Sequence, residues 1–271
     1  MSRFAGRTVL VAGSTGMAAS AARALAAEGA RVFVTSRSEE HVRDLATVVE
    51  ASGGEVGWAA ADLANEAAVE DAFAACAERF GPRLDGLYHV AGISGRRFGD
   101  GPVHEASLEG WQAVMTTNAQ STFLTTRAAV RRMRDQEPDA DGQRGAILLM
   151  SSVLATHPSP EHFATHAYAA SKGAIEAFVR AAASAYAPDG IRVNAIAPGL
   201  VATPMSRRAQ EDSDILAHLR RRQPLAADGP IDADAVTDVA LHLLSREARM
   251  VTGQVIAVDG GWGVSQTPSP G

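Results

Sequence analysis

The stretch "VLVAGSTGMAAS" (9–20) decides the fold of this chain. An apolar run of the kind that forms a buried strand leads into a glycine-rich turn, and an alanine-rich helical segment follows. Gly13 and Gly16 allow a sharp turn, and the spacing G-x-x-G-x-x-A leaves the first amides of the helix free to bind an anion. The stretch predicts a diphosphate site between a strand and a helix. Its candidate residues are Gly13, Ser14, Thr15, Gly16 and Met17.

Apolar runs of this kind recur along the chain, with helical segments between them. They are "RTVLVAG" (7–13), "ARVFVTS" (30–36), "EVGWAAA" (55–61), "LDGLYHVAG" (84–92), "GAILLMSS" (145–152), "IRVNAIAPG" (191–199) and "GQVIAVDGG" (253–261). Most are continuously apolar, which is typical of parallel strands buried on both faces. The alternation predicts an α/β fold, a Rossmann-type doubly wound parallel sheet of about seven strands flanked by helices. We place a single domain at 1–263 and expect a flexible tail at 264–271.

The composition narrows the class of protein. The 271 residues carry a formal net charge of −6, so neither nucleic acid nor an anionic membrane is expected as the main partner. We recognise no signal peptide, and no apolar run approaches the roughly 20 residues of a membrane span. Cys76 is the only cysteine, which excludes a disulfide within the chain and suits a reducing compartment. We therefore expect a cytoplasmic protein.

The end of the second expected strand bears on the choice of cofactor. A dinucleotide site usually has an acidic residue there to bind the adenosine ribose, but this chain has Ser36 followed by Arg37. A guanidinium binds a 2′-phosphate through paired hydrogen bonds, whereas a carboxylate would repel it. The pattern favours NADP(H) over NAD(H). Alternatively, Arg37 only begins the next helix in solvent.

The segment "YAASKG" (168–173) contains the only lysine of the chain. Tyr168 and Lys172 are spaced i, i+4, so a helix places both on one face. A phenol titrates near pH 10 unperturbed, and a neighbouring ammonium would lower its pKa toward the range useful for proton transfer. Because the chain has only three tyrosines, chance would seldom place its only lysine at this spacing. The pair predicts a general acid/base site.

Further motifs accompany these residues in a fixed order. They are "AGSTGMA" (12–18), "ADL" (61–63), "HVAG" (89–92), Asn118 in "MTTNAQSTF", "MSS" (150–152), "YAASK" (168–172), "NAIAPGLVATPM" (194–205) and "TGQVIAVDGGW" (252–262). Together they resemble the short-chain dehydrogenase/reductase family, and its 3-oxoacyl-acyl-carrier-protein reductase-like oxidoreductases in particular. The resemblance implies an NAD(P)(H)-dependent enzyme that interconverts a ketone and a secondary alcohol.

The resemblance also implies roles for individual residues. Tyr168 would be the general acid/base, and Lys172 would lower its pKa and hold the nicotinamide ribose. Ser152 would orient the substrate oxygen, and Asn118 would help to anchor a water that feeds protons toward Lys172. Further contacts would come from Asp62 and Leu63 at the adenine, from Ala91 and Gly92 beside the ribose, and from Pro198, Gly199, Val201 and Thr203 at the carboxamide.

Several of these assignments have a structural alternative. Asp62 could cap the helix that follows it, and Asn118 could be a packing amide in mid-helix. Ser151 competes with Ser152 for the catalytic role. The stretch "PGLVATP" (198–204) could be only a turn after a strand.

Three features depart from the family pattern. The glycine loop is one residue shorter than usual, a spacing similar to that of extended members such as epimerases and dehydratases. The usual asparagines before "AG" are here His89 and Val90. The segment 153–167 is longer than usual, and its His162 and His166 are spaced i, i+4 like a pair of metal ligands. We expect no metal there and interpret the segment as a pocket wall.

Two alternatives to the oxidoreductase stay open. One is an epimerase or dehydratase that uses a tightly bound nicotinamide cofactor, and the other is a regulatory protein that binds the cofactor without turnover. The substrate, a small carbonyl compound or alcohol, cannot be identified further. The resemblance implies a homo-oligomer, a tetramer or a dimer, with helices near 107–134 and 168–187 at one interface. Candidate pocket residues are Ser94, Leu154, His162, Leu200 and Met205.

Overall fold

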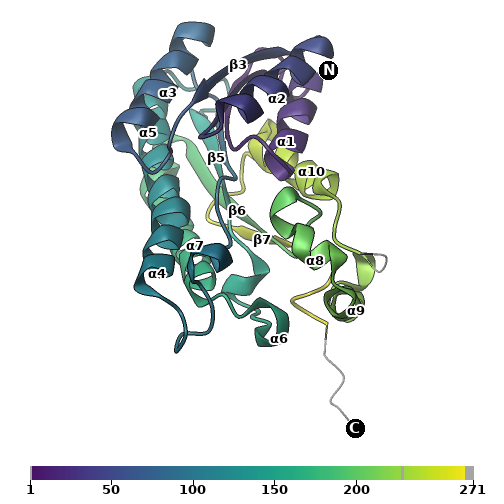
Figure 1. Cartoon of the computed structure of the whole chain (residues 1–271). Coiled ribbons are helices and arrows are strands. Elements are labelled where there is room, and N and C mark those ends of the chain that lie inside the picture. The colour runs from purple at the N-terminus through teal and green to yellow at the C-terminus, as the bar shows by residue number, and fades with distance from the viewer. Residues whose placement is uncertain (1, 227–228, 266–271) are drawn as a thin grey trace.

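The sheet of this protein is parallel throughout. The computed structural model describes residues 2–226 and 229–265. Within them, seven strands pair in the order β3-β2-β1-β4-β5-β6-β7 (Figure 1). The strands are β1 (Thr8–Ala12), β2 (Arg31–Ser36), β3 (Glu55–Ala60), β4 (Gly86–His89), β5 (Gly145–Met150), β6 (Ile191–Pro198) and β7 (Val255–Val258). Each lies within one of the apolar runs, so the predicted doubly wound α/β sheet is confirmed.

Helices cover both faces of the sheet. They are α1 (Met17–Ala27), α2 (Glu39–Ala51), α3 (Glu66–Phe80), α4 (Leu108–Val114), α5 (Ser121–Asp135), α6 (Pro160–Phe163), α7 (His166–Tyr186), α8 (Arg207–Glu211), α9 (Ser213–Arg222) and α10 (Ala233–Leu244). The core residues of α1, α2 and α10 pack on one face, and those of α3, α5 and α7 pack on the other (Figure 1).

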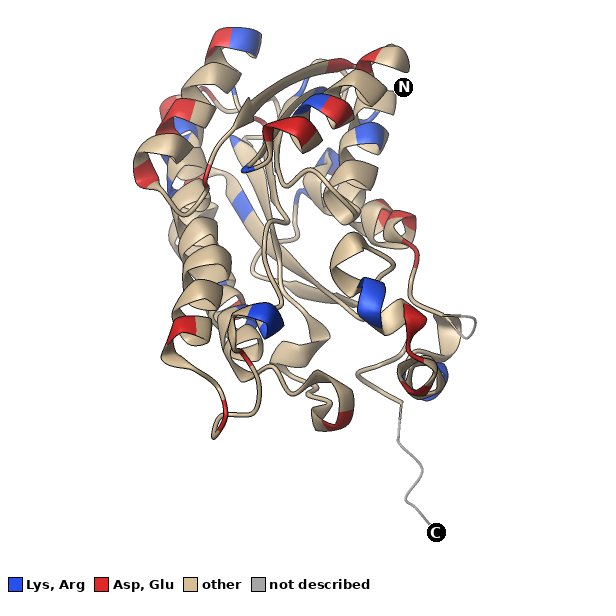
Figure 2. Ribbon diagram, viewed as in Figure 1, with Lys and Arg blue, Asp and Glu red and all other residues tan. Residues whose placement is uncertain are grey.

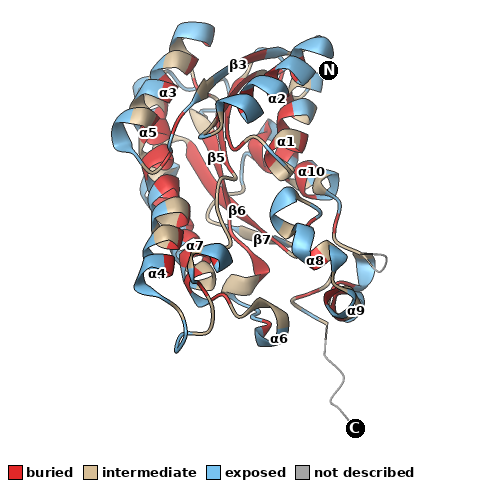
Figure 3. Cartoon of the chain, viewed as in Figure 1, coloured by how far each residue is buried: buried red, intermediate tan, exposed pale blue. Residues whose placement is uncertain are grey.

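The first strand shows why the runs are continuously apolar. Val9 and Val11 belong to the core beneath α1, α2 and α10. The alternate residues Leu10 and Ala12 belong to the core beneath α3, α5 and α7. Both faces of β1 are therefore excluded from solvent. Figure 3 shows that most of the central strands are buried as well. A polar residue at either set of positions would lose its hydration on folding.

The charged residues lie mainly on the outer elements. In Figure 2, red and blue segments are interspersed on the helices, and the strands are mostly tan. This mixture agrees with the modest net charge of −6. The arginine runs of α5 and α9 belong to these outer helices.

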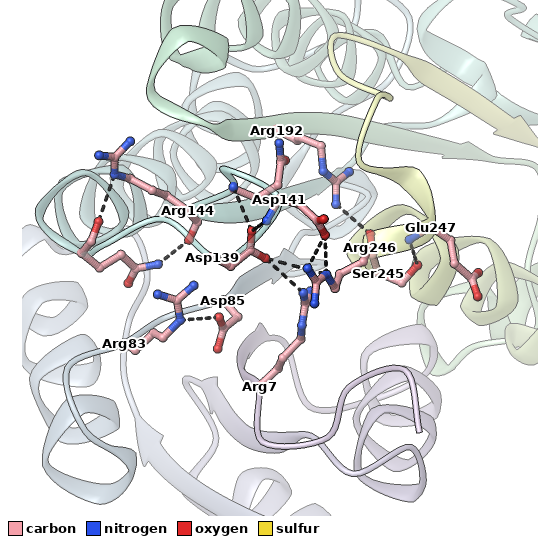
Figure 4. Close-up of polar contacts among 12 residues, drawn as sticks. Arg7, Arg83, Asp85, Asp139, Asp141, Arg144, Arg192, Ser245, Arg246 and Glu247 are labelled. Atoms are coloured by element: carbon pink, nitrogen blue, oxygen red, sulfur yellow. Dashed lines mark hydrogen bonds and ion pairs between the residues drawn. The ribbon is translucent and has the colours of Figure 1, made fainter. Parts of the chain in front are cut away.

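At the amino edge of the sheet, polar contacts tie the chain together (Figure 4). The buried guanidinium of Arg192 donates hydrogen bonds to the carbonyl oxygens of Leu243 and Ser245, at 2.8 and 3.0 Å. It thereby satisfies carbonyls at the end of α10, which helices leave without partners. Close by, the Arg246 Nε donates to Asp141 Oδ2 at 2.6 Å. This edge is occupied by structural contacts.

The opposite, carboxyl edge carries the two segments that interrupt the strand–helix alternation. The expected loop at 153–167 contains a 3₁₀ turn at Val153–Ala155 and the short helix α6. The segment between β6 and α10 contains α8 and α9. These helices lie at one end of the molecule in Figure 1 and share a small apolar core. The predicted tail at 264–271 falls outside the described residues from 266 onward.

Candidate active site

Two cavities open along the carboxyl edge of the sheet. The order of the strands reverses between β1 and β4, so the chain leaves these neighbours toward opposite faces. Such a switch point is where open α/β sheets bind ligands. One cavity, of about 510 Å³, lies over the ends of β1, β2 and β3. The other, of about 170 Å³, lies over the ends of β4, β5 and β6, and Gly92 lines both.

The glycine loop is built for close approach. Gly13 has φ +136°, and a Cβ there would lie 2.9 Å from the Cβ of Ala18. Gly16 has φ +54°, and a Cβ there would lie 2.8 Å from Thr203 Cγ2. No side chain caps the amino end of α1, so its first amides stay available to an anion. The loop therefore fits the diphosphate of a dinucleotide.

The larger cavity gathers the residues expected around the adenosine. Its lining includes Gly13, Ser14, Thr15, Ser36, Arg37, Asp62, Leu63, Ala91 and Gly92. The hydroxyls of Ser14 and Ser36 are joined by a hydrogen bond of 2.8 Å, which ties the glycine loop to the end of β2. Residues far apart in sequence thus form one wall.

One structural alternative fails at this cavity. Helix α3 is capped by Asn65, which accepts from Ala68 N at 3.0 Å, so Asp62 is not its cap. Helix α2 is capped by Ser38, and the exposed Arg37 directly precedes it, so the alternative for Arg37 stays open. Asp62 and Arg37 both line the cavity.

Helix α7 brings Tyr168 and Lys172 to the smaller cavity. Both line it, one helical turn apart. The Lys172 side chain is buried, and its Nζ donates to the carbonyl oxygen of Met150 at 2.7 Å. The same nitrogen lies over the Tyr168 ring, 5.5 Å from the ring centroid. The predicted pairing of the two side chains is present.

The protonation equilibria differ from the expectation. Burial raises the pKa of Tyr168, and its hydrogen bond with the Ser152 side chain offsets this only in part. Burial also lowers the pKa of Lys172 to about 8. The expected lowering of the Tyr168 pKa by Lys172 is thus wrong for this arrangement. The Lys172 ammonium faces the ring and donates to the carbonyl oxygen of Met150, and desolvation is the largest cause of the raised Tyr168 pKa.

Geometry separates Ser152 from its neighbour Ser151. The Ser152 side chain interacts with Tyr168 and lines the cavity. Ser151 Oγ donates instead to Glu176 Oε1 at 2.9 Å, a contact with the buried side of α7. The sequence left both serines as candidates, and the one that faces the tyrosine hydroxyl is Ser152.

Asn118 lies in a π-helical turn, Met115–Gln120, between α4 and α5. Its fully buried amide accepts from Ile93 N at 2.8 Å, and it donates to Ile93 O and Ser171 Oγ, both at 3.0 Å. Both amide protons are therefore used, and the oxygen keeps one free lone pair. The side chain joins the loop after β4 to α7, so it holds the wall next to Tyr168. The anchoring of a water stays a prediction.

His89 stands where the family pattern has an asparagine, and its ring makes supporting contacts of its own. Its buried ring bonds Ser121 Oγ through Nε2 at 3.2 Å and Thr125 Oγ1 through Nδ1 at 2.9 Å. These bonds join β4 to α5. Burial, and secondly the charge of Lys172, lowers the pKa of His89 to about 3. The ring is therefore neutral at physiological pH.

The smaller cavity also contains the residues expected at the carboxamide. Pro198, Gly199, Val201 and Thr203 line it, together with Met17 from the start of α1. Gly199 has a specific reason to be glycine, since a Cβ there would lie 2.3 Å from Oε1 of the buried Gln223. The stretch 198–204 is therefore more than a turn after a strand: it forms a cavity wall.

Four of the five candidate substrate residues line this cavity: Ser94, Leu154, Leu200 and Met205. His162 does not; its ring packs against His218, with ring centroids 4.9 Å apart. Other residues of the wall were not predicted from the sequence, although Trp262 ends one of the quoted motifs. Among them are Arg96, Phe163, Arg208 and Trp262.

A carboxylate that the motifs did not indicate positions the start of α7, which carries Tyr168. Asp100 is buried, and its two oxygens accept from Ala167 N and Tyr168 N, each at 2.9 Å. It thus satisfies two free amides at the start of α7.

Among helices of the described residues, none is both long and apolar enough to cross a membrane.

Comparison with known proteins agrees with this arrangement. A family model described as enoyl-(acyl carrier protein) reductase matches residues 11–263. The chain is 32% identical, over 97% of its length and 98% of the relative, to the 2,5-dichloro-2,5-cyclohexadiene-1,4-diol dehydrogenase LinX of Sphingobium indicum.

Solved structures agree as well. A short-chain type dehydrogenase/reductase from Mycobacterium ulcerans superposes with a TM-score of 0.87 at 29% identity, covering 98% of this chain and 93% of that one. A variant of actinorhodin polyketide ketoreductase, solved with NADPH, superposes with a TM-score of 0.83 at 29% identity, covering 95% and 97%.

Proposed function

The chain belongs to the short-chain dehydrogenase/reductase family and is an NAD(P)-dependent enzyme of that family, and we propose that it interconverts a ketone and a secondary alcohol with Tyr168 as general acid/base. The observation that carries this proposal is one cavity lined by Ser152, Tyr168 and Lys172 beside the glycine loop. A bound nicotinamide supplies a hydride to the carbonyl carbon, or accepts one from the alcohol.

The roles follow from where the groups lie. In ketone reduction, the phenol of Tyr168 gives its proton to the carbonyl oxygen as that oxygen gains charge. Its raised pKa supports this direction, because the group is protonated at neutral pH. The Ser152 hydroxyl hydrogen-bonds the same oxygen and orients it. Lys172 lies over the Tyr168 ring, and in this proposal it holds the nicotinamide ribose beside the tyrosine.

Tyr168→Phe tests the mechanism. It removes the proton donor and keeps the ring, so we expect NADPH consumption with a panel of ketones to fall by about 10²-fold or more. Tyr186→Phe, at the other end of the same helix, is the matched control. If Tyr168→Phe retains most of the rate, this mechanism is wrong. Cofactor that co-purifies with the chain, with interconversion of substrates but no net change in nicotinamide absorbance, would favour the epimerase or dehydratase alternative.

We also propose that NADP(H) is preferred over NAD(H). The exposed guanidinium of Arg37 lines the adenosine cavity at the end of β2, where Ser36 stands in place of a carboxylate. A 2′-phosphate placed there would meet a positive charge and two serine hydroxyls, those of Ser14 and Ser36. The ketoreductase structure with NADPH supports this choice by analogy.

The same proposal includes a homo-oligomer, a tetramer or a dimer, formed through α5 and α7. Phe123 on α5 is 44% exposed and packs edge to face on Phe178 of α7, with centroids 6.4 Å apart. An exposed aromatic pair on two neighbouring helices is typical of a contact surface. Light scattering after size exclusion tests it, and a monomer that Phe123→Asp leaves unchanged would contradict it. We propose a cytoplasmic location from the single, buried Cys76.

A further inference from the structure

Three side chains with metal-binding atoms meet between α6 and α9. They are Glu161, His162 and His218, whose potential ligand atoms all lie within 4.8 Å of one another. His162 Nε2 lies 3.7 Å from Glu161 Oε1, and His218 Nδ1 lies 3.9 Å from Glu161 Oε2. These distances are too long for hydrogen bonds. The atoms converge without bonding each other.

The His218 ring gives an independent sign that something belongs between them. Its side chain is only 6% exposed. Its Nε2 bonds Ser159 Oγ at 3.0 Å, but its buried Nδ1 has no hydrogen-bond partner among the described residues. Unsatisfied buried polar atoms are rare and costly. A ring held through one nitrogen, with the other directed at a carboxylate and a second imidazole, has the orientation of a metal ligand.

We propose that Glu161, His162 and His218 bind a zinc-class divalent cation that joins α6 to α9. Two imidazoles and one carboxylate form a donor set that suits Zn²⁺ rather than Mg²⁺ or Ca²⁺. Bonds of about 2.0–2.1 Å in a tetrahedral site separate ligand atoms by about 3.3 Å. The two nitrogens lie 3.7 and 3.9 Å from different oxygens of Glu161, and all ligand atoms lie within 4.8 Å of one another, so binding needs a contraction of about half an ångström at the carboxylate and at most about 1.5 Å elsewhere. Glu161, 69% exposed, is free to make it.

His218 suits the role chemically as well. Burial, and secondly the neighbouring His162, lowers the pKa of His218. The ring is then neutral at pH 7, which is the form that binds a metal. The sequence spacing had suggested His162 and His166 as a pair of metal ligands, but His166 is not part of this cluster. His166 lies at the start of α7, and its Nδ1 accepts from Val103 N at 2.9 Å.

The cation would act on the wall of the active-site cavity. Phe163 follows His162 and lines that cavity, as does Trp262. The Trp262 ring packs on Phe163 and on His218, with centroids 5.9 and 5.6 Å apart. A metal that fixes α6 against α9 therefore holds these aromatic rings in place. The proposal revises our expectation of no metal.

Calorimetric titration of the full chain with ZnCl₂, after removal of metals by a chelator, tests this site. We expect one Zn²⁺ per chain with a dissociation constant well below about 100 µM, and no binding of Mg²⁺ in that range. Glu161→Gln and His162→Gln should each weaken Zn²⁺ binding by at least about tenfold. His104→Gln, a surface histidine beside Glu105, is the matched control and should change nothing.

Glu161 is exposed, so its substitution leaves the fold intact and the test interpretable. Absence of saturable Zn²⁺ binding by the parent chain would overturn the proposal. Binding that survives both substitutions would also overturn it, because the cation would then occupy another site.

A second inference rests on the proposed function and concerns its substrate. Two guanidiniums, Arg96 and Arg208, line the active-site cavity, one from the loop after β4 and one from α8. Burial, and next the charge of Arg208, lowers the pKa of Arg96. Arg96 Nη2 donates to His162 O at 2.5 Å, and among the described residues no carboxylate oxygen lies within 4 Å of its guanidinium. Two like charges therefore line the cavity, and the charge of Asp100 is a smaller effect on the Arg96 pKa than burial and Arg208.

The nearby acids are committed elsewhere. Asp100 holds the amides at the start of α7. Asp212 reaches Arg208 only at 3.8 Å and on the surface, where such pairs contribute little. The rest of the wall is largely apolar, with Leu154, Leu200 and Trp262. We infer that the substrate is a ketone or alcohol with an apolar body and an anionic group, a carboxylate or a phosphate, that Arg96 and Arg208 bind.

A pair of ketones that differ only in a terminal carboxylate or its carboxamide tests this inference. We expect the parent enzyme to favour the carboxylate by at least about tenfold in kcat/KM, since charge-assisted hydrogen bonds contribute roughly 1.5–3 kcal/mol each. Arg208→Gln should remove most of that preference, through a higher KM for the carboxylate. Arg207→Gln, whose residue does not line the cavity, is the control.

The outcomes distinguish the inference of an anionic substrate from the proposed oxidoreductase activity. Equal turnover of both ketones by the parent enzyme contradicts the anionic substrate and leaves the oxidoreductase intact. A phosphate-bearing ketone that is turned over faster than the carboxylate supports the inference and identifies the anion. No turnover of any of these ketones contradicts the proposed function and, with it, this inference.

Discussion

The Asp100 carboxylate accepts a hydrogen bond from the main-chain nitrogen of Tyr168 at 2.9 Å, across a separation of 68 residues. Its other oxygen accepts from Ala167 N at the same distance. Asp100 therefore sets where α7 begins and how Tyr168 enters the cavity. It is not part of the cavity lining, so we regard it as a positioning residue.

Asp100→Ala should reduce both stability and turnover. Removing an N-terminal cap costs about 0.5–2 kcal/mol, and the tyrosine hydroxyl loses its fixed position. We expect a lower thermal midpoint and a kcat reduced by about tenfold or more, with little change in the KM for the cofactor. Asp100→Asn keeps an acceptor and should recover part of the rate. A purely structural role would lower the thermal midpoint and leave kcat unchanged.

Lys172→Arg tests whether the only lysine of the chain is needed as lysine. The Nζ is buried and donates to Met150 O, in a space shaped for a compact ammonium. A planar, forked guanidinium keeps the charge but not this geometry. We expect a folded protein, judged by circular dichroism, that has lost at least about 90% of its turnover. Near-normal activity would mean that the position of the lysine is chance.

His89→Asn should reduce the pH dependence of the unfolding free energy below pH 6.5. The pKa of His89 is lowered to about 3 in the folded chain, against an ordinary value of 6.5. Below pH 6.5 the unfolded chain therefore binds a proton that the folded chain does not, so stability falls as the pH drops from 6.5 toward 3. Asparagine does not titrate, so this part of the slope disappears.

Urea unfolding between pH 7 and pH 4 measures the effect. The difference in unfolding free energy between these two pH values should be smaller in His89→Asn than in the parent chain. His104→Asn, on the surface, provides the control and should keep the parent slope. Parallel slopes for His89→Asn and the parent would show that the buried ring is not the source.

Arg37→Ala should change the choice of cofactor. Loss of a charge-assisted contact with the 2′-phosphate costs roughly 1.5–3 kcal/mol, or about tenfold to a hundredfold in the KM for NADPH. The KM for NADH should stay within about twofold, because NADH carries no such phosphate. Arg43→Ala, an exposed arginine of α2 paired with Glu39, is the control. An equal loss for both cofactors would contradict the assignment of Arg37.

The motifs located the centre of the site because those residues are close in sequence or lie at strand ends. Tyr168 and Lys172 share one helix, so their juxtaposition follows from helical spacing alone. The glycine loop and the end of β6 meet because parallel strands end at one edge of the sheet. The outer wall was largely missed. Arg96, Phe163, Arg208 and Trp262 come from irregular loops and short helices whose path no periodicity predicts.

The sequence by itself determined the class of fold and predicted the pairing of Tyr168 with Lys172. Continuous apolar runs can be buried only between two helical layers, and helical spacing brings Tyr168 and Lys172 to one face. Only the tertiary structure decided the electrostatic state of that pair, the role of Asp100, and the meeting of Glu161 with His218. The desolvation of a side chain and the contacts between distant segments depend on how the loops pack. Both are set by many neighbouring residues from different parts of the chain, so no local sequence pattern predicts them.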